Sequence, residues 1–247
     1  AVLVALLIPL LLGGSELLPR LQRFPPLLLL GLFGMIVLCW GINAVRLRLL
    51  LGPQGAALGR WRSLGVIMAT EFAICSTPGG SGGPLALMAL LARHRVPAAH
   101  SSAVFAMDQL NDLVFFLCAM LGIVIYMLFH RFSPSLQGML LASALMMAAG
   151  LLLGLVLLRW RRALMRGNGR VLRRLKVGEA TRRRWTRKLL HFFRAFAATW
   201  RLPKRVLALV FGLTCLHWAV RYSVLYLALL GLGVDLQWVS SFLVQML

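Results

Sequence analysis

Carboxylates and glycines gather in one stretch of an otherwise apolar sequence. Residues 71–112 hold three of the six acidic residues, Glu71, Asp108 and Asp112, together with the densest glycine cluster. A charged side chain near the bilayer centre costs about 2.5 to 3.5 kcal/mol on insertion scales, so such residues usually face a partner or a cavity. We therefore expect this stretch to bind a cation or a proton, to contact a substrate, or to pair with a basic group.

The glycine cluster has the composition of a broken helix. In order it reads Thr77, Pro78, Gly79, Gly80, Ser81, Gly82 and Gly83, and a second proline, Pro84, follows. Glycine permits backbone conformations that other residues avoid, and proline suits the first turn of a helix. Free amides at the N-terminus of a half-helix bind anions, so the cluster predicts a phosphate or carboxylate site. The alternative is a tight turn in which the glycines serve packing only.

The acidic residues each have a predicted role. Asp108 and Asp112 are four residues apart, which places them on one helical face with Asn111 beside them. They would couple transport to protons or cations, contact the substrate or pair with a basic group; the alternative is a helix start in contact with water. Glu71 is expected to pair with Arg93 or Arg221, or to bind a proton.

One enzyme motif also matches the glycine cluster. Residues 79–83 satisfy the G-x-S-x-G pattern of serine hydrolases, with Ser81 as nucleophile and His217 as a conceivable base. A nucleophile elbow needs a strand–turn–helix context, which the sequence does not predict. A lone histidine such as His217 is more often a satisfied packing residue. No metal-binding or cofactor motif is found, so we predict neither a cofactor nor an enzymatic activity.

The elements that must position these residues are membrane helices. Of the 247 residues, 60% are hydrophobic and 13% are charged, far from the composition of soluble proteins. Apolar runs at 27–45, 101–129, 137–158 and 206–230 approach or exceed the roughly 20 residues that cross a bilayer. We predict an all-α, polytopic transmembrane helix bundle forming a single domain over 1–247. It begins in a first helix at 1–13, and we expect it to be part of a longer domain.

Positive charge sets the predicted orientation. The formal net charge is +21, and 17 of the 27 Lys and Arg residues fall within residues 159–205. This is typical of a cytoplasmic loop beside anionic lipid, and no feature favours nucleic acid. Within it, aromatic residues recur at helical spacing opposite basic ones, which predicts an amphipathic interfacial helix. Residues 46–62, with four arginines and no acid, predict another cytoplasmic loop.

The segment between two predicted cytoplasmic flanks cannot cross the membrane once. Arg93, His94 and Arg95 follow the glycine cluster, just as the arginines of residues 46–62 precede it. We therefore predict a re-entrant helical hairpin, with limbs at 63–76 and 84–92 and the break at the glycines. Broken backbone at membrane depth is tolerated only where protein or a wet cavity satisfies it.

The order of these features resembles the transmembrane family of lysylphosphatidylglycerol synthase, a flippase-like family. The resemblance covers T-P-G-G-x-G-G, the basic turn R-H-R-V-P and D-Q-L-N-D-L, all within residues 77–113. The positions that match the family pattern are Thr77, Pro78, Gly82, Gly83, Arg93, Asp108 and Asp112. Two positions depart from it, since Pro84 stands where the family often has Glu and Gln109 where it often has Arg.

The resemblance implies a lipid translocator in a bacterial inner membrane. Its substrate would be an anionic or aminoacylated phospholipid, or an isoprenoid-linked lipid, and its partners would be membrane lipids with anionic headgroups. The glycine break would receive the anionic headgroup, the three acids would bind its cationic part or cycle protons, and Arg93 and Arg221 would meet phosphate. A secondary transporter of a small anion or amino acid and an intramembrane serine hydrolase remain alternatives.

Overall fold

The described part of the chain is built from helices. The computed structural model describes residues 24–129, 134–159, 179–234, 237–238, 241–242 and 245. Every regular element in those residues is helical, which confirms the predicted all-α class. The predicted first helix at 1–13, the basic residues 160–178 and Asp235 lie outside the described residues.

Three helices of the described residues are long and apolar enough to cross a membrane. They are α3 (Pro26–Leu51), the apolar part of α7 (Ala98–Phe129) and α11 (Lys204–Gly231). At 1.5 Å per residue, the 26 residues of α3 measure about 39 Å, which exceeds the roughly 30 Å of hydrocarbon. The predicted multi-pass helical membrane protein is confirmed at this level.

The chain divides into two compact units. The first comprises residues 1–95 and 212–246, and the second comprises 96–211 with residue 247. The division falls inside α11, which belongs to the second unit up to Phe211 and to the first from Gly212 onward.

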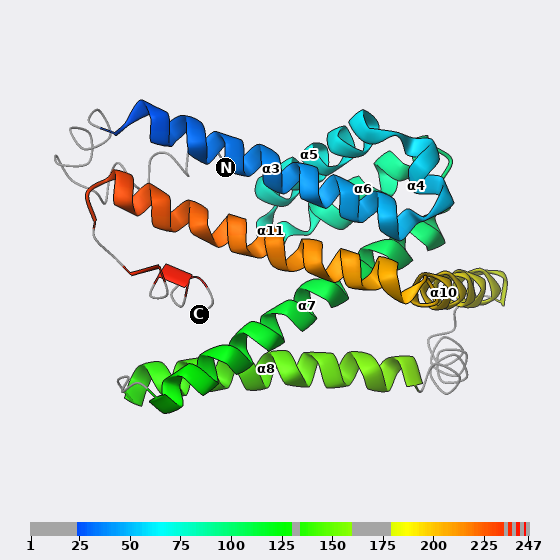
Figure 1. Ribbon diagram of the computed structural model, residues 1–247. Helices are drawn as coiled ribbons and strands as arrows, with labels where there is room; N and C mark the ends of the chain where they lie inside the picture. The colour runs from blue at the N-terminus through cyan, green and yellow to red at the C-terminus, as the bar shows by residue number, and fades with distance from the viewer. Residues whose placement is uncertain are drawn as a thin grey trace. The chain divides into compact units, whose positions relative to one another are not determined.

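In the first unit, α3 and the part of α11 from Gly212 onward lie side by side and antiparallel (Figure 1). The Cys39 thiol, in the middle of α3, is 3.9 Å from the carbonyl oxygen of His217, in the middle of α11. At one end of the pair, Gly231 lies against Leu28 and the ring of Phe24, and a Cβ at this position would collide with both. Close packing at Gly231 therefore holds the two helices together at this end.

A helical hairpin completes the first unit. It consists of α5 (Arg60–Ser76), the 3₁₀ turn η1 (Pro78–Gly80) and α6 (Gly82–Arg93), and the short α4 (Pro53–Leu58) joins it to α3. The limbs measure about 25 Å and 18 Å, each shorter than the hydrocarbon layer. The sequence predicted this hairpin and its break.

The break needs glycine at two successive positions. Gly79 and Gly80 have φ values of 63° and 69°, in the left-handed region that side chains with a Cβ rarely adopt. The return helix starts at Gly82, two residues before the predicted start at Pro84. The reason is a cap, because the Thr77 hydroxyl accepts a hydrogen bond of 2.8 Å from the Gly82 amide.

Gly83 is expected to be intolerant of even one methyl group. A Cβ there would collide with the Ile74 side chain on the facing limb. Gly83→Ala should therefore lower the free energy of unfolding by about 1 to 3 kcal/mol through overpacking. Thermal unfolding of the purified protein measures this, and Gly83→Ala combined with Ile74→Ala should recover part of the loss. Gly65→Ala is the control, because nothing lies within 4 Å of a Cβ at that position.

The end of α3 corrects the predicted loop over residues 46–62. The helix continues past Val45 to Leu51, and Arg46 is inside the unit with only 2% of its surface exposed. The hydropathy pattern assigned Arg46 to a cytoplasmic loop because it is charged. The structure instead gives its guanidinium an acceptor on the preceding turn, Asn43.

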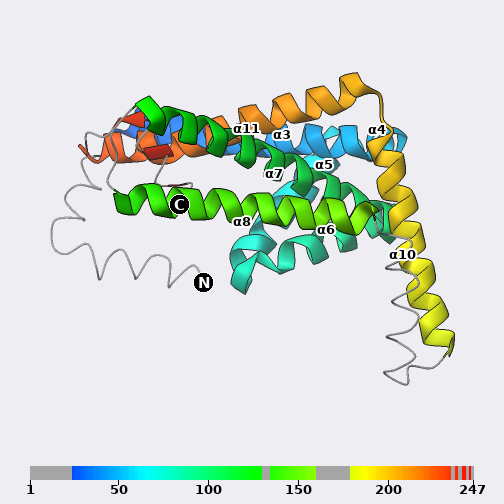
Figure 2. The ribbon, with the colours of Figure 1, turned by 90° about the horizontal axis from the view of Figure 1, so that it is seen from below.

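The second unit contains α7, α8 (Pro134–Arg159) and α10 (Glu179–Trp200). Figure 2 shows α10 running across the direction of α8. The aromatic face predicted for the amphipathic helix includes Phe192, Phe196 and Trp200, whose rings follow one another along α10. Phe196 is buried within the fold, so part of this face packs against protein.

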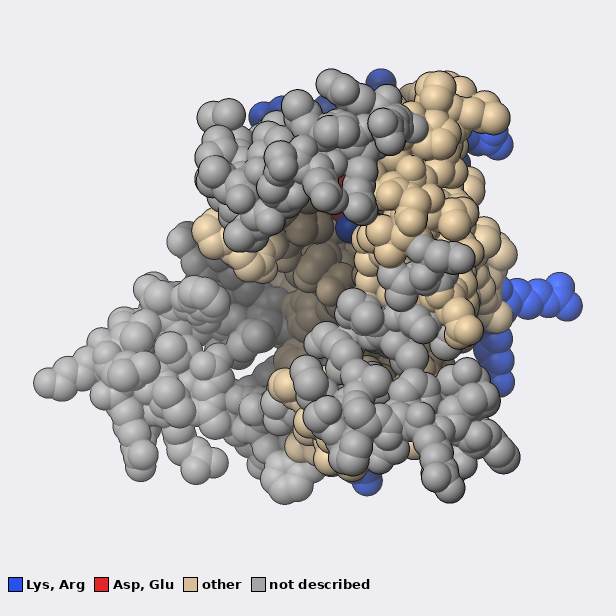
Figure 3. Space-filling view, turned by 90° about the vertical axis from the view of Figure 1, so that its left-hand side faces the viewer, with Lys and Arg blue, Asp and Glu red and all other residues tan. Residues whose placement is uncertain are grey.

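One face of the described residues is predominantly uncharged (Figure 3). In the face drawn in Figure 3, most of the described surface carries neither acidic nor basic side chains, and most of the visible Lys and Arg side chains project at its margins. Large apolar side chains such as Phe33 and Phe72 are exposed. This distribution suits a protein whose sides contact hydrocarbon.

Candidate functional site

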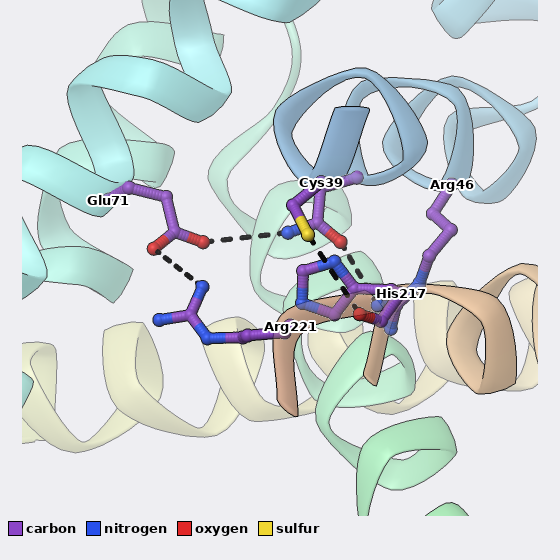
Figure 4. A network of polar contacts seen from close by, with 6 residues as sticks. Cys39, Arg46, Glu71, His217 and Arg221 are labelled. Carbon is purple, nitrogen blue, oxygen red and sulfur yellow. Dashed lines mark hydrogen bonds and ion pairs between the residues drawn. The ribbon is translucent and has the colours of Figure 1, made fainter. Parts of the chain in front are cut away.

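Polar side chains from three helices of the first unit converge at one place (Figure 4). The helices are α3, α5 and α11, and the residues are Cys39, Asn43, Arg46, Glu71, His217 and Arg221. Cys39 and His217 each lie about 18 to 21 Å from both ends of their helices. The contact between Cys39 and His217 therefore lies midway along two helices of membrane-spanning length.

Glu71 is the acceptor at the centre of the cluster. Asn43 Nδ2 donates a hydrogen bond of 3.5 Å to Glu71 Oε1, and Arg221 NH1 lies 3.7 Å from Glu71 Oε2. The predicted pairing of Glu71 with Arg221 is confirmed. Both distances exceed the 2.7 to 2.9 Å of a tight charge-assisted hydrogen bond, so the carboxylate is held loosely.

The ion pair is partly open to its surroundings. The side chain of Arg221 is 47% exposed and that of Glu71 is 20% exposed. A pair with this exposure and so long a contact contributes little to stability. Arg221 also lies over the ring of Trp218, with the guanidinium carbon 5.9 Å from the ring centroid.

Asn43 and Arg46 were not predicted as site residues. Arg46 NH1 donates a hydrogen bond of 3.1 Å to Asn43 Oδ1, while the amide nitrogen of the same Asn43 side chain faces Glu71. Asn43 thus links a buried cation to the carboxylate. The available signal was the i, i+3 spacing of these two polar residues, which puts them on one helical face.

His217 differs from the satisfied packing residue that the sequence favoured. Only 3% of its surface is exposed, and its Nδ1 atom has no hydrogen-bond partner in the part of the chain that the structure describes. Its ring packs edge-on to Trp218, with the centroids 5.3 Å apart. The backbone carbonyl of His217 accepts the Cys39 thiol, so the residue contacts α3 through its main chain.

Helix geometry explains why these residues meet. Each Cα–Cβ bond tilts toward the N-terminus of its own helix. Asn43 follows Cys39 by four residues on α3, and Arg221 follows His217 by four residues on α11. Because the two helices are antiparallel, the side chains of Asn43 and Arg221 point toward each other along the helix axes, to the level of the contact between Cys39 and His217. Glu71, on α5, reaches the same level from the side and meets both.

Comparison with known protein families identifies the family of this chain. The profile of the family described as "Lysylphosphatidylglycerol synthase TM region" matches residues 1–247, the full length of the sequence. The chain belongs to this family. No curated protein and no solved structure matches the chain. Family membership and the apolar helices together identify a multi-pass membrane protein related to lipid handling.

The glycine segment of the family motif is the tip of the hairpin in the first unit. Thr77 Oγ1 accepts the Gly82 amide and donates to the Ala73 carbonyl at 2.7 Å, so it joins the two limbs. Gly82 lies against Thr77 and Gly83 against Ile74. These contacts give the segment a packing and capping role, and anion binding there remains a proposal.

Ser81 does not form a catalytic pair with His217. Its hydroxyl donates to the Pro78 carbonyl at 3.2 Å, and it is not a hydrogen-bond partner of the His217 Nδ1 atom. The G-x-S-x-G match falls in a helix–turn–helix and lacks the strand that a nucleophile elbow requires. These contacts give the hydrolase interpretation no support.

The remaining motif residues of the family lie elsewhere. Asp108, Asn111 and Asp112 are on α7 in the second unit, where both aspartates are partly exposed. Asn111 is buried and donates to the Met107 carbonyl at 2.8 Å. Arg93 is exposed at the C-terminal end of α6, about 16 Å along the helix from the glycine segment.

Proposed function

We propose that this protein moves a phospholipid or an isoprenoid-linked lipid between the leaflets of a bacterial inner membrane. The observation that carries the proposal is the partly exposed Glu71–Arg221 ion pair, which joins the short α5 to α11, a helix of membrane-spanning length. An acid and a base that remain partly open among apolar helices are suited to a charged headgroup in transit. Membership in a lipid-handling family supports the same conclusion.

The charges of the cluster fit the two ends of a polar headgroup. Glu71 would bind a cationic group, while Asn43 holds its second oxygen in place. Arg221, and Arg93 at the end of α6, would contact phosphate. Asp108, Asn111 and Asp112 would bind protons or a polar group on α7 of the second unit, and the glycine hairpin of the first unit would let the headgroup approach the backbone.

Lipid movement in reconstituted vesicles tests this proposal. The wild-type protein would be reconstituted in two sets of proteoliposomes. One set contains headgroup-labelled anionic lipids, and the other contains headgroup-labelled zwitterionic lipids. We expect movement at least about tenfold faster than in protein-free vesicles, because a charged headgroup crosses hydrocarbon slowly unaided. Asp112→Asn in the same assay reports whether the α7 acids take part.

The outcome also separates lipid movement from solute transport. If folded protein moves none of the labelled lipids, the lipid proposal fails. Saturable uptake of a small anion or amino acid by the same vesicles would then establish the secondary-transporter alternative.

A further inference from the structure

The guanidinium of Arg221 rests on two groups that proteins use to bind organic cations. One is the Glu71 carboxylate, 3.7 Å from NH1, and the other is the face of Trp218, whose centroid is 5.9 Å from the guanidinium carbon. A carboxylate beside an aromatic face attracts ammonium groups through charge and through the ring quadrupole. Trp218 and Arg221 are three residues apart on α11, which keeps this arrangement on one helical face.

We propose that Glu71 and Trp218 form a subsite for an ammonium group and that Arg221 occupies this subsite as a tethered competitor. The inference rests on the proposed function, because it assigns the cationic part of the ligand to the same cluster. It adds Trp218 as a binding residue and gives Arg221 an inhibitory role in the ligand-free protein.

The contacts of the Arg221 guanidinium allow it to move away from Glu71. Its side chain is 47% exposed, and its contact with Glu71 is long for an ion pair. Glu71 does not depend on Arg221 alone, because Asn43 donates to its other oxygen. The carboxylate therefore keeps one hydrogen-bond donor when the guanidinium moves.

Exchange of one cation for another avoids a costly intermediate. If an ammonium group replaces the guanidinium, Glu71 retains a positive partner throughout, and no unpaired carboxylate is left among apolar helices. The displaced guanidinium is then free to meet an anionic group of the same ligand. The ligand class is accordingly an organic ammonium, carried either by a lipid headgroup or by a free amine.

Equilibrium binding to the purified protein tests the competitor role. The probes are ethanolamine and dihexanoylphosphatidylethanolamine, with dihexanoylphosphatidylglycerol as the amine-free lipid. Arg221→Gln should bind at least one amine probe about tenfold more tightly than the wild type, a gain of about 1.4 kcal/mol. Dihexanoylphosphatidylglycerol should show no gain. A gain with the lipid amine alone identifies a headgroup, and a gain with ethanolamine as well identifies the amine itself.

Matched variants separate this role from a general loss of charge. Arg221→Met keeps the apolar stem and has the same expected result, so the test survives poor folding of Arg221→Gln. Arg221→Lys keeps a tethered cation but loses the planar stacking on Trp218, so it should show a smaller gain than Arg221→Gln. Arg62→Gln removes an equal charge from the exposed start of α5 and should change nothing. Added to Arg221→Gln, either Glu71→Gln or Trp218→Leu should cancel the gain.

Unchanged or weaker binding of both amines by Arg221→Gln and Arg221→Met overturns the inference. This result does not depend on lipid movement. Tighter amine binding without transport would contradict the proposed function alone, and transport without tighter binding would contradict the competitor role alone.

Discussion

Glu71→Gln is expected to reduce lipid movement to the rate of protein-free vesicles while leaving the protein folded. Glutamine keeps the shape of the side chain and an oxygen that can accept from Asn43, but it removes the charge that faces Arg221. The partly exposed ion pair contributes at most about 1 kcal/mol to stability. The midpoint of thermal unfolding should therefore change by only about 2 to 4 °C. The measurement is the rate of headgroup-labelled lipid movement at matched protein density.

Two comparisons make this prediction specific. Arg62→Gln changes one charge on the same helix, at its exposed start, and should retain wild-type transport. Glu71→Asp keeps the charge on a shorter side chain, so its already long contacts with Asn43 and Arg221 should lengthen and transport should fall only partly. Transport by Glu71→Gln at more than half the wild-type rate would show that this carboxylate does not bind the moving headgroup.

Arg46→Met is expected to have the largest effect on stability. Arg46 is 2% exposed and donates to Asn43 Oδ1 at 3.1 Å. Methionine fills the space of the stem but donates no hydrogen bond, so a buried polar contact to a charged group is lost. The free energy of unfolding should fall by about 2 to 4 kcal/mol. Thermal unfolding in detergent should show a midpoint lower by roughly 4 to 16 °C.

Arg48→Met provides the matched control for Arg46. It lies two residues later on α3, is only partly buried, and donates to the Gly55 carbonyl at 3.2 Å. Its replacement should cost about 1 kcal/mol. Equal or smaller destabilisation by Arg46→Met would mean that the buried hydrogen bond between Arg46 and Asn43 does not stabilise the fold.

The scarcity of charge made part of the site predictable from sequence. Few charged residues lie inside the apolar segments, so Glu71 had few basic residues available as partners. Arg221 was one of the two that we predicted. The pairing follows from the high cost of leaving a carboxylate alone in hydrocarbon. The predicted roles of Asp108 and Asp112 remain predictions, since these residues lie on α7 in the second unit.

Asn43, Arg46 and Trp218 were missed for physical reasons. Hydropathy places a charged residue such as Arg46 outside the span, yet a side-chain acceptor one turn away allows it to be buried. The role proposed for Trp218 depends on which face of α11 meets α5, and a single sequence does not encode that. The start of α6 was misplaced because the Thr77 cap is a contact across the turn.

The hairpin could be predicted from sequence because few residue types fit the backbone conformation of its turn. Two successive residues with positive φ demand glycine, and proline supplies a helix start. The close packing of Gly82 and Gly83 could not be predicted in the same way. It depends on the side chains of Thr77 and Ile74 on the opposite limb, which only the folded hairpin brings together.

The spacing of His217 and Arg221 has a consequence for sliding motion along α11. They are four residues apart, so their side chains leave the helix at nearly the same azimuth, about 6 Å apart along its axis. A ratchet step of about one turn past α5 would bring the imidazole, whose Nδ1 atom lacks a hydrogen-bond partner in the described residues, to the level now held by the guanidinium. Glu71 would then exchange a permanent cation for a ring that can be neutral. A translation of one helical turn would thus change the electrostatic character of the site without a change in any residue's own protonation.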